Sequence, residues 1–201
     1  MNKWYNALWW IIAPFFSLVH PCRLVGRERL PENGLYCANH SCLSDPICLI
    51  VAIGHKHQMH AMAKAEFMRV PVIGWILKKA GIFSVERGKS DIAAIKTAMR
   101  YLKNKENVLI FPEGTRIKNG VDKYGNPREA KGGAAMLAVR TGAQIVPVYI
   151  PPKKRWFRVT KVVIGEPYFP ETVSTKGSTE EYQAIAADLM DRIFALEDQS
   201  K

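Results

Sequence analysis

The chain has 201 residues, of which 48% are hydrophobic and 23% are charged. This composition is that of an ordinary globular protein and excludes a largely disordered chain, and the length fits one domain with a sizeable core. Lysine and arginine outnumber aspartate and glutamate by 29 to 18, so the net charge of +11 predicts an anionic partner: a membrane surface, a phosphorylated ligand, an acidic carrier protein or nucleic acid.

The first predicted element is an apolar segment, WYNALWWIIAPFFSLV, at residues 4–19. As a helix it would be about 24 Å long, shorter than the roughly 30 Å hydrocarbon core of a bilayer. Its aromatic rings favour the headgroup region, so we expect residues 1–20 to form an interfacial membrane anchor, built as two short helices hinged at Pro14. A helix buried against its own domain and a single short transmembrane span are the alternatives. An A-x-A-like cleavage site is absent, which argues against a signal peptide.

After this segment, predicted strands and helices alternate through residues 21–201, which we expect to form one catalytic domain. Four predicted helices begin near Pro46, near Pro71, after Ser90 as the cap and near Gly133. A last predicted helix contains the apolar repeat that includes Tyr182. The predicted strands lie at residues 23–29, 35–38, 59–63, 82–85, 108–111, 144–150 and 161–164. The alternation predicts an α/β fold, a layered mixed or largely parallel sheet flanked by helices. Residues 118–129 are polar and turn-rich and are predicted to form a loop or lid.

His40 and Asp45 lie in the connection between the strand at 35–38 and the next helix. In a regular helix, side chains five residues apart point about 140° away from each other, so a pairing requires an irregular backbone, which Ser44 or Asp45 as helix cap would supply. A carboxylate that binds one imidazole nitrogen leaves the other as a competent general base. Alternatively, Asp45 merely caps the helix and His40 merely ends the strand.

Two further strand ends carry polar residues, Glu86-Arg87 and Glu113-Gly114-Thr115-Arg116. Such ends converge at one edge of an open α/β sheet, and arginine forks with free backbone N–H groups suit a phosphate. These features indicate an enzyme that removes a proton from a hydroxyl of a phosphorylated substrate. Neither a G-x-S-x-G elbow nor a Walker glycine loop is present, so a covalent acyl-enzyme is not required.

A metal or other cofactor is not expected. Three histidines, at positions 55, 57 and 60, lie close together. A solvated loop that holds His55 and His57 and leads into the strand at 59–63 explains them better than a metal site, because no carboxylate lies near them in the sequence. The cysteines at 22, 37, 42 and 48 form no C-x-x-C pair, which predicts reduced thiols in a cytosolic domain.

Four ordered blocks of the sequence resemble those of the glycerolipid acyltransferases, with the best match to the bacterial 1-acylglycerol-3-phosphate O-acyltransferases. The blocks are Asn39-His40-x4-Asp45, Gly81 to Arg87, Phe111 to Arg116 and Val146-Pro147-Val148. The resemblance implies that His40 is the general base and that Asp45 orients it. It also implies that Pro147 shapes the acyl-chain side of the site and that the acceptor's phosphate is held by Arg87, Glu113, Gly114, Thr115, Arg116, Lys64 and Lys131.

The resemblance implies that a fatty acyl group moves from acyl-ACP or acyl-CoA to the free hydroxyl of 1-acylglycerol 3-phosphate (lysophosphatidic acid), giving phosphatidic acid. It also implies a place on the cytoplasmic face of the cell membrane, as a monotopic or peripheral protein. Basic residues that could face an anionic membrane or an acyl carrier protein, or simply be solvated, are Lys78, Lys79, Lys153, Lys154, Arg155 and Arg158.

Two other functions stay open. One is acylation of another acceptor, such as glycerol 3-phosphate or a different lysophospholipid. The other is a non-catalytic module that binds anionic lipid. Nucleic acid is not expected as a partner, because the sequence has no recognised nucleic-acid-binding helix or zinc module.

Overall fold

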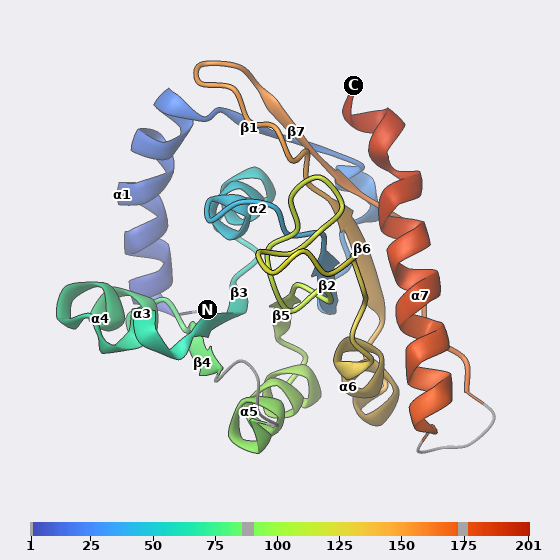
Figure 1. Ribbon diagram of the computed structural model, residues 1–201. Coiled ribbons are helices and arrows are strands. Elements are labelled where there is room, and N and C mark those ends of the chain that lie inside the picture. Colours follow the sequence, from blue (N-terminus) through green and yellow to red (C-terminus); the bar gives the residue numbers. More distant parts are fainter. Residues whose placement is uncertain (1, 86–90, 173–176) are drawn as a thin grey trace.

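A computed structural model of the chain describes residues 2–85, 91–172 and 177–201. Within these ranges seven strands form one sheet, in the order β1-β7-β6-β2-β5-β3-β4 (Figure 1). Neighbouring strands are parallel except for β6 and β7, which are antiparallel. The strands are β1 Cys22–Val25, β2 Leu35–Ala38, β3 Met59–Lys64, β4 Phe83–Val85, β5 Asn107–Ile110, β6 Ile145–Tyr149 and β7 Thr160–Ile164.

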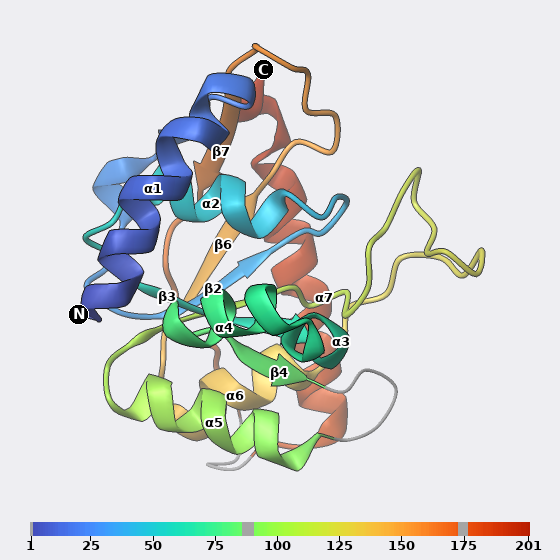
Figure 2. The ribbon, with the colours of Figure 1, turned by 90° about the vertical axis from the view of Figure 1, so that its left-hand side faces the viewer.

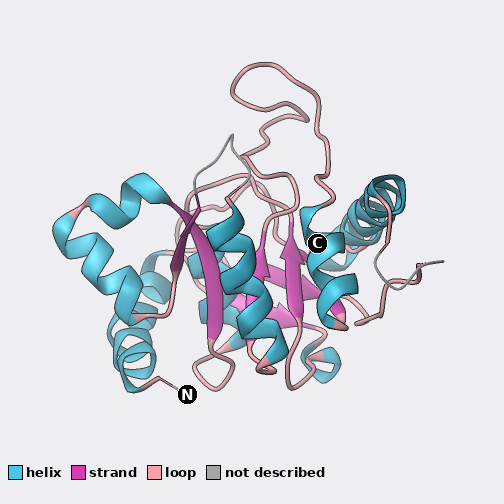
Figure 3. Cartoon of the chain, turned by 90° about the horizontal axis from the view of Figure 1, so that it is seen from below, coloured by secondary structure: helices cyan, strands magenta, loops and turns pink. Residues whose placement is uncertain are grey.

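Helices cover both faces of the sheet, as the view from below shows (Figure 3). One face packs against α5, α6 and α7, and the other packs against α2 and part of α1. The predicted α/β fold with a mixed sheet flanked by helices is therefore confirmed. The helices are α1 Lys3–Val19, α2 Asp45–Ile53, α3 Ala65–Arg69, α4 Pro71–Lys79, α5 Ile92–Lys103, α6 Gly133–Thr141 and α7 Thr179–Ala195, with short 3₁₀ turns η1 Arg27–Arg29 and η2 Glu197–Ser200.

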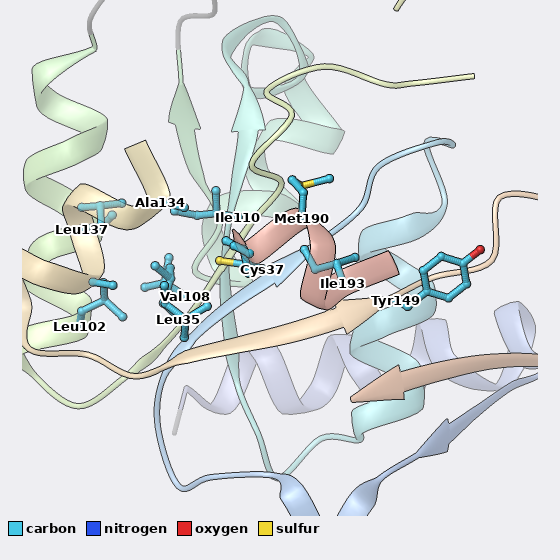
Figure 4. Packing of buried hydrophobic residues seen from close by; sticks show 14 of the residues in the cluster. Leu35, Cys37, Leu102, Val108, Ile110, Ala134, Leu137, Tyr149, Met190 and Ile193 are labelled. Atoms are coloured by element: carbon cyan, nitrogen blue, oxygen red, sulfur yellow. The ribbon is translucent and has the colours of Figure 1, made fainter. Parts of the chain in front are cut away.

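The sheet separates two hydrophobic cores because successive strand residues point to opposite faces. In β2, Leu35 and Cys37 join the core under α5, α6 and α7 (Figure 4), whereas Tyr36 and Ala38 join the core under α2. All four side chains are fully buried. A parallel strand that is buried on both faces reads as an unbroken apolar run, which explains why this strand was recognisable in the sequence.

Three local features that follow α1 differ from the predictions. β1 ends at Val25, because Gly26 adopts a positive φ of 81° and the chain turns into η1 instead of extending to Arg29. A Cβ atom at Gly26 would lie 2.6 Å from the Ile164 carbonyl oxygen, so this turn requires glycine. The helix predicted after Ser90 is capped by Asp91, which accepts a hydrogen bond from the N–H of Ala94. The short helix α3 was not predicted.

The apolar N-terminal segment forms one helix, α1, that continues through Pro14 and is not hinged there. One side of α1 packs on the domain: Tyr5 and Ala13 are buried, and the indole N–H of Trp9 donates to the Ile50 carbonyl oxygen of α2 at 3.3 Å. Its other side is exposed. Across the described ranges, no helix combines the length and the apolar character needed to cross a bilayer. The interfacial anchor at residues 1–20 stays a prediction.

Residues 118–129 form a long loop without helix, held by isolated bridges between Lys118 and Val121 and between Val121 and Pro127. The loop extends away from the sheet on the side to which β2 and β4 point (Figure 2). It therefore lies at the edge of the sheet where the predicted site residues gather, and its role as a lid stays a prediction.

Candidate active site

The candidate site lies at the carboxyl ends of the parallel strands. β6, β2, β5, β3 and β4 are neighbours and run in the same direction, so the segments that follow them meet at one edge of the sheet. His40 follows β2, Glu113 to Arg116 follow β5, and Lys64 ends β3. Arg87, which follows β4, lies outside the described residues.

The structure brings His40 and Asp45 together. Nδ1 of His40 lies 2.9 Å from Oδ2 of Asp45, and both side chains are buried. The same Oδ2 accepts hydrogen bonds of 2.7 Å from the backbone N–H groups of Ser41 and Cys42. These bonds fold the connection into a tight turn ahead of α2, which supplies the irregular backbone that the spacing requires. Because the cap position belongs to Ser44, Asp45 is not a simple helix cap.

A buried lysine completes the surroundings of Asp45. Nζ of Lys154 donates to Oδ1 of Asp45 and, at 2.9 Å, to the carbonyl oxygen of Pro151. Burial raises the pKa of Asp45, but the hydrogen bonds from His40 and Lys154 and the ammonium charge outweigh burial and hold this pKa below its usual range. The interpretation of Lys154 as a surface cation is therefore wrong, since its side chain is only 3% exposed.

Neighbouring elements fix the backbone and ring of His40. Its N–H donates to Oε2 of Glu113 at 2.5 Å, and its carbonyl oxygen accepts from the N–H of Ile117 at 2.8 Å. The imidazole stacks on Phe111 with ring centroids 4.1 Å apart. The side chain of Asn39 binds both the N–H and the carbonyl oxygen of Ile150, each at 2.8 Å. The segments after β5 and β6 thus hold the histidine in place.

Glu113 lies behind the histidine, with both carboxylate oxygens in use. Oε2 binds the backbone N–H of His40, and Oε1 binds Nε of Arg128 at 3.0 Å. Burial raises the pKa of Glu113 to about 7, although the His40 N–H and Arg128 favour the charged form. These contacts give Glu113 a role in positioning His40. The direct contact with substrate predicted for Glu113 stays a prediction.

The predicted phosphate-binding residues lie around the turn after β5. Gly114 has a positive φ of 65°, and a Cβ atom there would lie 3.3 Å from Cδ and Cε of Lys131, so the lysine side chain lies against the glycine. The N–H of Lys131 donates to the Pro112 carbonyl oxygen at 2.9 Å, and Arg116 is exposed. Thr115, between Gly114 and Arg116, is partly exposed.

The side chains of Lys64, His55 and His60 have partners of their own. Lys64 pairs with Glu66 at 2.7 Å on the exposed surface. His60 is buried between the Gly81 carbonyl oxygen and Glu106, and His55 contacts the rings of Trp9 and Trp10. Within residues 2–85, 91–172 and 177–201, no three His, Cys, Asp or Glu side chains are grouped so that they could hold a metal ion.

The geometry therefore provides a histidine with one fixed nitrogen. Asp45 accepts from Nδ1–H, which leaves Nε2 as the nitrogen that can take up a proton. Sequence reasoning found this pair by its spacing but missed Lys154, which is far from Asp45 in the sequence and belongs to no motif. The one available signal was topological: a residue after β6 comes close to β2 because the two strands are parallel neighbours.

Comparison with known proteins shows the family of the chain. The sequence matches the family model described as "Acyltransferase" over residues 22–151, well over half of the chain. It is 35% identical to the 1-acyl-sn-glycerol-3-phosphate acyltransferase of Bacillus subtilis, over 91% of this chain and 92% of that protein. It is 30% identical to the chloroplastic enzyme LPAT1 of Arabidopsis thaliana over 68% of this chain, but it spans only 36% of that longer protein.

Among solved structures, the crystal structure of the 1-acyl-sn-glycerophosphate (LPA) acyltransferase PlsC from Thermotoga maritima matches with a TM-score of 0.67. The match has 25% sequence identity and covers 98% of this chain and 79% of that chain. The family model, the Bacillus relative and this structure confirm the resemblance that the four sequence blocks indicated. The chain belongs to the acyltransferase family, alongside 1-acyl-sn-glycerol-3-phosphate acyltransferases of bacteria and plants.

Proposed function

We propose that this acyltransferase moves a fatty acyl group from acyl-ACP or acyl-CoA to the free hydroxyl of 1-acylglycerol 3-phosphate and so forms phosphatidic acid. The observation that carries the proposal is the 2.9 Å contact between Nδ1 of His40 and Asp45, which presents Nε2 as a general base. The acceptor is inferred from the names of the Bacillus, Arabidopsis and Thermotoga relatives.

In the proposed reaction, Nε2 of His40 removes the proton from the acceptor hydroxyl while its oxygen attacks the thioester carbonyl carbon. The C–S bond then breaks, and the imidazolium returns the proton to the leaving thiolate. Asp45 holds the ring and stabilises the imidazolium between the two steps. A thioester is already activated, so an enzyme-bound acyl group is not needed.

The acceptor's phosphate would lie near the turn after β5. The Lys131 side chain lies against Gly114, and the cations of Arg116 and Lys131 lie at the same edge of the sheet. Arg87 follows β4 in the sequence, and Lys64 is the last residue of the adjacent strand β3. Both are proposed to contribute to the same anion site. A phosphate requirement is therefore part of the proposal.

The test is a steady-state assay of the purified protein with lysophosphatidic acid and each acyl donor. His40→Ala should lower kcat by about 10²–10⁴-fold, the usual contribution of a general base. Lys103→Met, which removes an exposed lysine at the end of α5, is the matched control and should turn over at the wild-type rate. Turnover by His40→Ala close to that of the wild type would contradict the proposal.

An acceptor panel separates the alternatives. Monoacylglycerol, which lacks the phosphate, should be a poor acceptor. Preferred turnover of glycerol 3-phosphate or another lysophospholipid would identify a different acceptor. Salt-sensitive binding to anionic lipid without any turnover would indicate a non-catalytic module.

We also propose that residues 1–20 anchor the catalytic domain, residues 21–201, to the cytoplasmic face of the membrane. The support is an exposed apolar surface on α1 and α4, which includes Trp10, Phe15, Leu18, Val72 and Trp75. The rings of Trp4 and Trp75 meet edge to face at 5.7 Å, and Nζ of Lys79 lies 5.0 Å from the Trp4 ring centre. Exposed rings beside cations are typical of a helix that lies in the headgroup region.

A further inference from the structure

Lys154 is a buried cation that contacts the far side of the catalytic carboxylate. It comes from the loop between β6 and β7, outside the blocks that the sequence shares with the glycerolipid acyltransferases. Its side chain is 3% exposed and that of Asp45 is 0% exposed. A lysine is almost never buried to this extent unless a partner balances its charge. Its hydrogen bonds to Asp45 and Pro151 supply that balance.

The two oxygens of Asp45 have separate partners. Oδ2 accepts from His40 and from the backbone N–H groups of Ser41 and Cys42, and Oδ1 accepts from Lys154. Lys154 thereby stops the carboxylate from turning Oδ1 toward the imidazole. The ring of His40 is thus held in one orientation by a carboxylate that is fixed at both oxygens.

The charges of the buried group explain what Lys154 adds. With Lys154 present, the negative charge of Asp45 and the positive charge of the ammonium cancel, so the three side chains together carry no net charge when the His40 imidazole is neutral. Without Lys154, the remaining pair of Asp45 and His40 would carry no net charge only when His40 is an imidazolium. Because burial favours the arrangement without net charge, the ammonium favours the imidazole that can accept a proton.

We propose that Lys154 is a positioning residue that keeps His40 in its proton-accepting form at neutral pH by neutralising Asp45. This rests on the proposed function, in which His40 is the general base. The other titratable or charged groups near the pair are the Glu113 carboxyl with its partner Arg128, and the thiols of Cys22 and Cys48, which interact electrostatically with Lys154.

The test measures the pH dependence of kcat/KM in four variants. Lys154→Gln keeps a hydrogen-bond donor without the charge, and Lys154→Met loses both. Each should move the acidic limb of the profile to higher pH, and a shift of about one pH unit lowers kcat/KM about tenfold on that limb. KM for the acceptor should not change. Lys154→Arg, which keeps the charge, and the control Lys103→Met should keep the wild-type limb.

Each outcome decides between the proposals. An inactive wild type, or an active His40→Ala, overturns the proposed function itself. An active wild type with an unshifted limb in folded Lys154→Gln or Lys154→Met overturns the role of Lys154 alone. If thermal unfolding shows that neither neutral variant folds while Lys154→Arg does, Lys154 serves folding and the proposal fails.

The pKa of Glu113 is raised to about 7, so the Lys154→Gln profile is also measured in a Glu113→Gln background. A shift that persists in this background supports Lys154. A shift that disappears there assigns the limb to Glu113 and overturns the proposal.

Discussion

At the scale of single residues, Glu113 gives the protein a pH-dependent stability. Its pKa is raised from 4.5 to about 7 in the folded state, so the folded chain binds more protons than the unfolded chain between these values. The free energy of unfolding should therefore fall as the pH rises through this window, by on the order of 3 kcal/mol in total.

Glu113→Gln removes this titration. The stability difference between Glu113→Gln and the wild type should shift in favour of the variant from pH 4.5 to pH 7 and level off above it. Urea unfolding at a series of pH values measures this difference. A difference that stays constant across the window would show that Glu113 is not protonated in the folded state.

Asp45 contributes a pH dependence of stability with the opposite sign. Its pKa is held below the ordinary value of 3.8, so the stability that its hydrogen bonds provide is complete at neutral pH and is lost as the pH falls through the lowered pKa. The two carboxyl groups near His40 therefore respond to pH in different windows. This separation lets the measurement on Glu113 be made without interference from Asp45.

At the scale of elements, α1 carries the membrane prediction. Phe15 and Leu18 are 73% and 71% exposed. Burying such a side chain in lipid is worth roughly 2 kcal/mol, so the double variant Phe15→Glu with Leu18→Glu should lower vesicle binding by at least about tenfold. Co-sedimentation with liposomes measures the effect.

A matched control comes from the opposite face of the sheet. Ile92, at the start of α5, is also an exposed apolar residue, and Ile92→Glu should leave vesicle binding unchanged. Equal losses in the control and the α1 variant would mean that added negative charge, not the apolar side of α1, weakens binding.

The elements differ in how far the sequence reveals them. The apolar run at β2 and the periodic helix α5 were predictable, because burial and helical spacing leave a local pattern. The His40–Asp45 pair was also predictable, since its spacing is a local feature and polar residues also follow two other strands, at 86–87 and 113–116. The contact of Lys154 with Asp45 was not, because lysine is usually a surface residue and nothing in its neighbourhood distinguishes it from Lys153. Only the pairing of β6 with β2 brings it to the site.

At the scale of the whole molecule, the net charge of +11 should make binding to anionic vesicles salt-dependent. The Debye screening length falls from about 10 Å at 0.1 M salt to about 3 Å at 1 M, so the electrostatic part of binding should decline over this range. Binding to zwitterionic vesicles, which reports the apolar surface, should not decline. Parallel co-sedimentation series separate the two parts, and a salt-independent affinity for anionic vesicles would contradict the electrostatic part.

The edge pairing of β1 with β7 also has a consequence for biosynthesis. β1 follows α1 directly, but its sole partner strand in the described sheet begins at Thr160. At a translation rate of about 5–20 residues per second, β1 waits on the order of ten seconds for β7 to be made. During that interval α1 has already been synthesised, while β1 still lacks its partner strand in the described sheet. A bilayer or a chaperone can therefore bind α1 before the ribosome has synthesised β7, the last strand of the sheet.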